Sequence, residues 1–585
     1  MSAPPPPIDP TAPSGTARWL APLAVTVTVA VVVLLALLHL GADPPPEMPE
    51  ANPMDEGLWA DGARGRFLFG DWFADDTGNA LLIAPLHSLL TLGAYELFGI
   101  GLWQTRLVPA LCGIATCLLL GAWVARRLGV LGGAAAALLL ATCPLLDQHA
   151  RSGLLESEQL FWICAAFCCM AGACDRPLRL LAAGALLAAG AATKPNTAVL
   201  GALPLLVVFV VEWRAAARDP LRRPGVHRRH LLAGVAAVAG GTLGSLPLVL
   251  WVWLPHWDAF REAAHAESGA DQWTIGEHLL RFGLAFAREL EPGVQRLWAP
   301  LRNAPAIVLL AWAWCVARAA APLRRGERAV AAWALASVLV SEFAYMHVGR
   351  RQLMSVPALA VLGTFWLWRA RGADGVPALR PQGPRVAWSL LLLLPMLVLR
   401  PYAGNLVTAW LGGGQHVNLA LGIALPAVWL LAVLALAPRL PAPDPWRRRA
   451  AALLPLLALA AVGFGTTRLA ALFPPGHTIR DAQRALAGRV EPGEVVLGQH
   501  ATLLLLAEPV RTVRRNLMER FYASPRPNED AFERLRPRYL LDYRDPQLAE
   551  FRDLPTGDYR TIVEVDYLRE RDGTCRYRLQ LRRRP

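Results

Sequence analysis

The chain contains a long series of apolar runs whose interiors carry almost no charge, and this pattern limits the folds that it can adopt. Most runs have about the 17–25 residues that an α-helix needs to cross the hydrocarbon core of a bilayer, and several are slightly shorter. Of the 585 residues, 55% are hydrophobic and only 18% are charged, whereas about 25% of residues are charged in ordinary globular proteins. The sequence therefore predicts a polytopic α-helical membrane protein.

Length and hydropathy predict about thirteen transmembrane helices. The predicted spans are residues 19–40, 105–124, 128–146, 159–174, 178–192, 197–212, 230–254, 304–320, 328–345, 353–368, 387–402, 417–436 and 450–472. The segment 80–98 is also apolar, but Pro85, His87 and Glu96 interrupt it. We therefore expect this segment to form an interfacial or half-inserted helix.

The distribution of arginine predicts the orientation of the spans. With the N-terminus in the cytoplasm, the arginine-dense short loops fall on the cytoplasmic side, as the positive-inside rule requires. These loops are residues 125–128, 175–179, 213–230, 322–328, 369–385 and 438–449. They explain most of the net charge of +13, so the charge does not indicate a nucleic-acid partner. The outer segments are then residues 41–104, 147–158, 191–196, 255–303, 347–352 and all that follow 472.

Three regions follow from this topology. Residues 1–18 are rich in proline and small residues, which predicts a disordered cytoplasmic tail. Residues 19–472 form the membrane domain. Residues 473–585 contain a helix start at Thr478–Leu486 and several apolar alternations that are typical of strands. We expect them to form a small extracytoplasmic α/β domain of about a hundred residues.

Two adjacent carboxylates, Asp55 and Glu56, lie in the first outer loop within the sequence MDEGLWADGAR. Apolar residues from Leu58 to Phe67 recur on one face of a helix, which predicts an amphipathic helix in the membrane interface. A carboxylate at this surface can act as a general base toward an acceptor hydroxyl. Acidic residues also favour the first turn of a helix, by roughly 0.3–1 kcal/mol. The spacing leaves both interpretations open.

A second group of charges lies in the outer turn HARSGLLESEQLFW, where Arg151, Glu156 and Glu158 precede an apolar span. Ionisable groups at membrane depth are often functional, but acids at a helix start are also common. The two interpretations are balanced for Glu156. For Glu158 we favour a simple helix-start role.

Three cations on the outer side oppose the orientation rule and so call for another explanation. Lys194 is the only lysine of the chain, and Arg350 and Arg351 are adjacent in YMHVGRRQL. An ammonium is a natural clamp for phosphate, and guanidinium groups bind phosphate with two parallel hydrogen bonds. The alternatives are that the lysine snorkels to the lipid headgroups and that the arginines contact ordinary lipids.

Neither a metal site nor a disulfide is indicated. The outer loop 255–303 contains several histidines and acids without the spacing of a metal ligand set. We therefore assign no metal ligands and no certain cofactor, and leave a requirement for a divalent ion open. Eight of the nine cysteines lie in or beside apolar spans without ligand spacing, as small buried apolar residues do.

The motifs together resemble those of the GT-C membrane glycosyltransferases, in the group that contains bacterial relatives of dolichyl-phosphate-mannose protein mannosyltransferases and of lipid A aminoarabinose transferases. The resemblance covers most of residues 55–200 and the start of the tenth span. The matching segments are DEGLWADGARGRFLFGDW, PLHSLLTLGAYELFGIGLWQTRLVPALCG, ARSGLLESEQLFW, ATKPNTAVL and HVGRRQLMSVPALAVLG.

This resemblance implies an inverting sugar transfer from a polyprenyl-phosphate donor to an acceptor hydroxyl on the outer face of a bacterial plasma membrane. Asp55 matches the catalytic acid of the first loop, with Glu56 beside it, and Glu156 stands where the family usually has an aspartate. Lys194 matches a recurrent basic position. The remaining cations, Arg151, Arg350 and Arg351, are candidates for binding the donor phosphate. The sugar stays open, and the acceptor can be a glycan, a lipid or a protein.

Two other functions fit parts of the sequence. A transporter or flippase of lipid-linked sugars would use the same cations without making a bond, but it predicts ionisable groups near the membrane midplane. The acids here cluster instead at the outer ends of helices. A scaffold or sensor would use the C-terminal domain to bind a partner. An assay of sugar transfer in proteoliposomes separates the three.

Overall fold

The computed structural model describes residues 15–44, 53–74, 79–219, 225–261, 325–343, 353–369, 476–513, 532–545, 556–569 and 575–585, together with a few isolated positions. Three predicted spans, 387–402, 417–436 and 450–472, lie outside the described residues, as do Arg350 and Arg351 and the part of the outer loop from 262 to 303.

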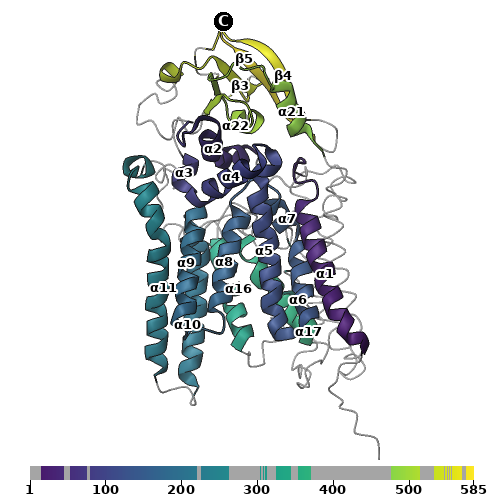
Figure 1. The fold of residues 1–585 in the computed structure, drawn as a ribbon, viewed down its shortest axis with the longest axis vertical. Helices are drawn as coiled ribbons and strands as arrows, with labels where there is room; N and C mark the ends of the chain where they lie inside the picture. Colours follow the sequence, from purple (N-terminus) through teal and green to yellow (C-terminus); the bar gives the residue numbers. More distant parts are fainter. Residues whose placement is uncertain are drawn as a thin grey trace, which may run out of the picture.

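Long helices run side by side in one bundle (Figure 1). Among the described residues, they are α1 (Gly15–Leu37), α5 (Leu102–Leu128), α6 (Val130–Ala141), α8 (Glu156–Met170), α9 (Pro177–Thr193), α10 (Leu203–Arg218), α11 (Val226–Leu248), α16 (Arg325–Phe343) and α17 (Val356–Arg369), and the short helix α7 (Pro144–Ala150) follows α6. Two short π-helices, η1 (Ala198–Ala202) and η2 (Val249–Trp253), flank α10 and α11. Every predicted span from 19 to 254 thus contains a helix.

Among the described residues, three helices are long and apolar enough to cross a membrane: Leu102–Leu128, Leu200–Arg218 and Val226–Trp253. The prediction of a polytopic membrane protein is confirmed in this coarse form, and the total of about thirteen spans stays a prediction. One predicted span, 128–146, is instead two helices, α6 and α7, that meet at an angle of 69°. Pro144 occupies the first position of α7, and a proline disfavours a helical conformation in the residue before it.

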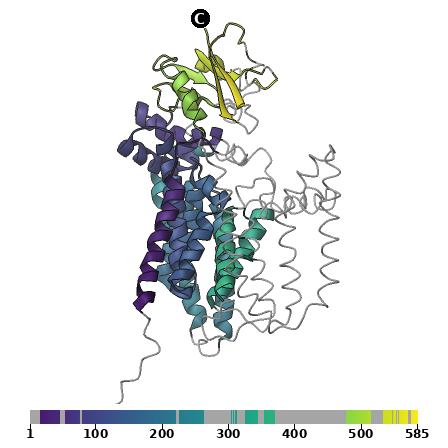
Figure 2. The same ribbon diagram turned by 90° about the vertical axis from the view of Figure 1, so that its right-hand side faces the viewer.

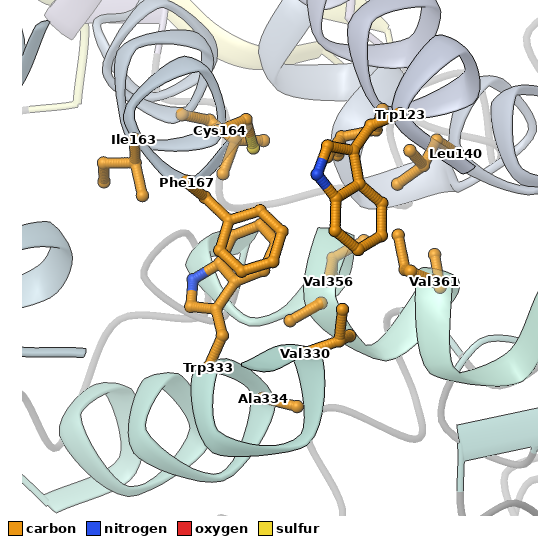
Figure 3. Packing of buried hydrophobic residues seen from close by; sticks show 14 of the residues in the cluster. Trp123, Leu140, Ile163, Cys164, Phe167, Val330, Trp333, Ala334, Val356 and Val361 are labelled. Atoms are coloured by element: carbon orange, nitrogen blue, oxygen red, sulfur yellow. The ribbon is translucent and has the colours of Figure 1, made fainter. Parts of the chain in front are cut away.

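Aromatic residues fill the centre of the bundle (Figure 3). Trp333 of α16 is fully buried and stacks on Phe167 of α8, with 4.1 Å between the ring centroids. The ring of Trp123, from α5, lies 5.3 Å from that of Phe167. Buried cysteines such as Cys164 pack in the same cluster, and no disulfide joins the cysteines that the structure describes.

The contact between α9 and α11 depends on the absence of side chains. A Cβ atom added to Gly184 would lie 1.9 Å from the carbonyl oxygen of Ala237, and one added to Gly240 would lie 1.9 Å from that of Leu181. The two backbones therefore touch directly, as small residues allow in membrane helices. Elsewhere α11 exposes large apolar side chains, such as Leu232, Val235 and Val238.

Three helices, α2 (Pro53–Phe69), α3 (Asn79–Ile83) and α4 (Pro85–Phe98), lie between one end of the bundle and the C-terminal domain (Figures 1 and 2). Residues 56–65 of α2 are all buried. The sequence predicted a helix here with one apolar face in the membrane interface. The structure instead covers the polar face with the C-terminal domain, so α2 is enclosed on both sides.

Within its described residues, the C-terminal domain contains a five-stranded mixed sheet with the order β2-β1-β3-β5-β4. Its elements are α21 (Thr478–Leu486), β1 (Val495–Leu497), α22 (Ala501–Leu504), β2 (Arg511–Val513), β3 (Tyr539–Tyr543), β4 (Arg560–Arg569) and β5 (Cys575–Arg583). Strand β1 is parallel to β2 and β3, while β5 is antiparallel to β3 and β4. Leu102, the first residue of α5, packs in the same cluster as α21, so the two domains share apolar packing. The predicted sheet domain is confirmed.

Candidate functional site

The two adjacent acids of the first loop occupy the first turn of α2 but have different surroundings. Glu56 is fully buried, and both of its carboxylate oxygens accept hydrogen bonds from Arg106 of α5. The distances are 2.8 Å from Nε to Oε2 and 3.0 Å from Nη2 to Oε1. Asp55 is only partly buried. Glu56 therefore holds the helix in place, while Asp55 is the acid of this turn that retains access to its surroundings.

Arg106 joins three segments of the chain at this point. Besides Glu56, it donates from Nη1 to the carbonyl oxygen of Leu40 at 3.0 Å and to that of Ala42. These carbonyls follow α1, so a single buried guanidinium connects α5, α2 and the end of α1. A bidentate charged pair of this kind also fixes orientation. The position of Asp55 is consequently set by the contacts of its neighbour.

The first turn of α8 carries the other predicted acid, Glu156, which forms an ion pair with Lys194. The distance from Nζ to Oε1 is 2.6 Å. Lys194 directly follows the C-terminal end of α9, and Glu156 begins α8. Each charge therefore sits at the helix end that its sign favours. The Lys194 side chain is 17% exposed and that of Glu156 only 3%, so the cation can reach a ligand that the acid cannot.

The next residues of α8 bind other elements. Ser157 donates to the carbonyl oxygen of Pro109 in α5 at 3.1 Å. Gln159 donates to the side chains of Asn196 and Thr197, each at 2.8 Å, and so holds the turn that contains Lys194. The start of α8 is thus a rigid frame around the ion pair.

Glu158, for which a simple helix-start role was favoured, is completely buried. It lies 2.9 Å from Nδ1 of His87 in α4 and accepts a hydrogen bond from Thr193 at 3.1 Å. Nε2 of His87 lies 3.4 Å from the hydroxyl of Thr91. The helix start therefore binds the covering helices as well as α9, and Glu158 links α4 to the Lys194 turn.

Gly153 brings the two acidic turns together. A Cβ atom added here would lie 3.5 Å from both Cβ and Oε2 of Glu56, and 2.9 Å from Cγ2 of Thr105. The turn before α8 therefore packs directly on the first turn of α2. We call these two adjoining turns, which carry Asp55 and the Glu156–Lys194 pair, the polar region. Helix α2 lies between the bundle and the C-terminal domain (Figure 1).

Arg151, a predicted phosphate-binding residue, borders the same region. Its Nη2 donates to the carbonyl oxygen of His39 at 3.2 Å, and Nη1 lies 3.8 Å from Oδ2 of Asp147. Burial lowers the pKa of Arg151, the Asp147 carboxylate opposes this shift, and repulsion from Arg106 adds to it. The remaining predicted cations, Arg350 and Arg351, lie outside the described residues.

Within the described part of the chain, no group of three or more histidine, cysteine and acidic residues is arranged to hold a metal ion. The sequence interpretation overlooked Arg106, although its position in the first turn of a predicted span was a usable signal, because charged residues within spans are rare and often functional. His87 gave a weaker signal as a lone interruption of an apolar segment.

Residues 83–240 match the protein family described as dolichyl-phosphate-mannose-protein mannosyltransferase. This segment includes the start of α8 and Lys194, and it begins after Asp55. No curated protein sequence matches the chain.

Solved structures resemble the whole chain. One is ArnT from Cupriavidus metallidurans bound to undecaprenyl phosphate, with a TM-score of 0.60 and 18% identity over 97% of this chain and 98% of that one. Another is the archaeal oligosaccharyltransferase AglB from Archaeoglobus fulgidus, in complex with an inhibitory peptide and a dolichol-phosphate. Its TM-score is 0.52, with 14% identity over 96% of this chain and 74% of that one. At these identities the likeness concerns the fold.

Proposed function

We propose that this chain transfers a sugar from a polyprenyl-phosphate donor to an acceptor hydroxyl. The chain has the GT-C glycosyltransferase fold, which confirms the resemblance predicted from its motifs. The reaction takes place at the polar region between the bundle and the C-terminal domain. Asp55 is the general base, and Lys194 binds the phosphate of the donor.

The observation that carries this proposal is the packing of the two acidic turns on each other. The turn with Asp55 and the turn before Glu156 touch at Gly153, and Glu156 holds Lys194 at 2.6 Å. A carboxylate that can take a proton and a cation that can bind a phosphate are thereby supplied from two adjoining turns. Both are needed for glycosyl transfer from a lipid phosphate.

Lys194 supplies the electrostatic part of the reaction. A polyprenyl phosphate departs as an anion, so its departure needs a positive charge more than a proton. An ammonium group has three N–H donors, and Glu156 occupies one of them. The other two are available to the phosphate oxygens, and the preorganised charge stabilises the negative charge that develops on them. Glu156 keeps the ammonium in this position.

Asp55 supplies the proton transfer. The acceptor oxygen attacks the anomeric carbon from the face opposite the phosphate, and the bond between that carbon and the phosphate oxygen breaks. The carboxylate takes the proton of the acceptor hydroxyl as the new bond forms. A single displacement without a covalent intermediate inverts the anomeric configuration. Glu56 supports the step by holding the turn through Arg106.

The remaining cations are assigned to the same donor. Arg350 and Arg351 contribute further charge toward the phosphate, and Arg151 lines the approach from the end of α1. The undecaprenyl phosphate bound to the similar ArnT structure supports a polyprenyl donor. We place the reaction on the outer face of a bacterial plasma membrane, with the N-terminus in the cytoplasm, because the arginine-rich loops favour that orientation.

The test is a transfer assay in proteoliposomes with a panel of radiolabelled undecaprenyl-phosphate sugars and membrane glycolipids, glycans and peptides as acceptors. We expect Asp55→Asn to lower the transfer rate by about 10²–10⁴, the usual contribution of a general base. The matched control is Asp71→Asn. Asp71 lies in the same loop, is exposed, and accepts a hydrogen bond from the backbone of Phe73, so its loss should leave the rate unchanged.

Two outcomes contradict the proposal. If Asp55→Asn transfers the sugar at the wild-type rate in a folded protein, Asp55 is not the base. If the wild-type protein moves the labelled lipid across the membrane and forms no glycosylated product with any acceptor, the protein is a transporter.

A further inference from the structure

We propose that Arg64 is a positioning residue through which the C-terminal domain fixes α2, so that this domain is part of the working enzyme. The catalytic part of this inference rests on the role proposed for Asp55, which lies on the same helix. Arg64 follows Asp55 by nine residues along α2, which is about 13–14 Å along a helix axis at 1.5 Å per residue.

Arg64 reaches into the C-terminal domain and is almost completely buried there, with 1% of its side chain exposed. Its guanidinium donates to the backbone oxygens of one short loop between α22 and β2. The acceptors are the carbonyl oxygens of Leu506 at 3.0 Å, Leu505 at 3.2 Å, Glu508 at 2.8 Å and Val510 at 2.6 Å. A rigid fork of five N–H donors suits such convergent oxygens, and the loop is thereby shaped around a residue of the membrane domain.

The charge balance of this contact is also unusual. Burial lowers the pKa of Arg64, and the Asp61 carboxylate at 3.8 Å opposes the shift. Both residues also bind Thr512 of β2: Arg64 donates to its hydroxyl at 3.3 Å, and that hydroxyl donates to Asp61 at 3.3 Å. The contact is thus specific in geometry, because buried charges are tolerated only when their hydrogen bonds are complete.

Close backbone packing continues this contact toward Asp55. A Cβ atom added to Gly57 would lie 2.9 Å from the backbone nitrogen of Leu503 and 3.2 Å from its Cβ. Since Gly57 is only two residues from Asp55, α22 packs against the same turn of α2 that carries the proposed base. Displacement of the C-terminal domain would therefore move or release this turn.

A second contact attaches the C-terminal domain to the segment that follows α1. Asp43 accepts hydrogen bonds from the backbone of Thr478 at 2.7 Å and of Ile479 at 3.0 Å, and so caps the first turn of α21. Asp43 follows directly after Ala42, whose carbonyl binds Arg106. The C-terminal domain is therefore attached both to the far end of α2 and to the segment that shares Arg106 with Glu56. These two attachments fix α2 against rotation.

The experiment compares the full-length variant Arg64→Met with wild type in kcat, in KM for the lipid-linked donor, and in deuterium exchange of residues 53–69. We expect kcat to fall by about 10²-fold, the cost of a displacement of about 1 Å at the reacting groups. We expect KM for the donor to stay near its wild-type value, since the phosphate is bound by Lys194, and exchange in α2 to rise. Arg64→Lys should recover part of kcat.

The matched control is Arg66→Met on the same helix, because Arg66 is exposed and donates to the nearby carbonyl of Gly70. Should Arg64→Met fail to fold, Gly57→Ala provides a second route: it should lower kcat through the close approach to Leu503. Gly62→Ala, whose Cβ would meet its nearest neighbour at an ordinary 3.4 Å, should not.

A wild-type kcat in Arg64→Met, with faster exchange in residues 505–512, would overturn the inference, because Arg64 would then only attach the domain. Unchanged exchange in α2 would overturn it as well. If the wild-type protein itself transfers no sugar, the proposed function fails, and the exchange comparison still decides whether the C-terminal domain fixes α2.

Discussion

The contact between α9 and α11 and the contact between α2 and the C-terminal domain solve the same packing problem with opposite chemistry. In the first, backbones touch at Gly184 and Gly240, where any Cβ would clash. In the second, a buried Arg64 binds four backbone carbonyls, and Asp43 caps a helix across the domain boundary.

The difference follows from the solvent around each contact. Lipid tails are as apolar as a leucine side chain, so helices in the bilayer gain little from burying apolar surface and associate through close van der Waals packing. Outside the bilayer, water competes for every polar group. A buried charge there gives a contact that is specific in geometry when all its hydrogen bonds are made. The proposed site lies where the helix bundle meets the C-terminal domain. There, at the end of the membrane helix α5, the contact is again made by a buried charged pair, Arg106 and Glu56.

The largest effect should come from breaking this boundary contact. Arg106→Leu leaves the Glu56 carboxylate buried without its partner, which should lower the free energy of unfolding by about 3–5 kcal/mol. Thermal and denaturant unfolding of the detergent-solubilised protein, followed by tryptophan fluorescence, measures the change.

The double variant Arg106→Leu with Glu56→Leu serves as the control. Because it removes both charges together, it should be more stable than Arg106→Leu alone. If the double variant is the less stable of the two, the uncompensated charge is not the cause of the loss.

A smaller effect should come from closing the gap between the membrane helices. Gly240→Ala places a methyl group against the backbone of Leu181, and such overpacking costs about 1–3 kcal/mol of stability. Gly241→Ala is a matched control, since its Cβ would lie 3.8 Å from its nearest neighbour, the Gly184 oxygen, and it makes the same change in helix propensity. Equal melting temperatures for the two variants would contradict direct backbone contact between α9 and α11.

The smallest effect should come from the cap at Asp43. Asp43→Ala removes an N-terminal cap of α21 and should cost about 0.5–2 kcal/mol, seen as faster deuterium exchange in residues 478–486. Asp481→Ala, in the first turn of the same helix, provides the comparison because its side chain is 66% exposed. If both variants exchange alike, Asp43 does not join the domains.

Local patterns predicted the elements well where a helix or strand depends on its own sequence. The helix start that the sequence predicted at Thr478–Leu486 is confirmed by α21, in which Ile479, Ala482 and Leu486 repeat on one buried face. The spans from 19 to 254 were found for the same reason. The break between α6 and α7 was missed, although Pro144 marks it in the sequence.

Contacts between segments that are distant in the chain could not be predicted from the sequence. Arg64 lies outside the apolar face of the predicted interfacial helix, and nothing in its neighbourhood reveals that residues 505–510 bind it. Similarly, Asp55 and Glu56 look alike in sequence, and only the contact of Glu56 with Arg106, 50 positions later, separates their surroundings. The pairing of Glu156 with Lys194 also needs the antiparallel packing of α8 on α9.

The most direct test of the proposed site is a single-turnover measurement that separates donor binding from transfer. Lys194 is the only lysine, so acylation of its amine by a water-soluble reagent, read by mass spectrometry, reports whether donor phosphate occupies the site. We predict that donor protects Lys194 equally in wild type and in Asp55→Asn, while the rate of transfer from the bound donor falls by about 10²–10⁴ in the variant. Transfer at the wild-type rate in Asp55→Asn, or acylation of Lys194 that donor does not slow, would contradict the proposed site.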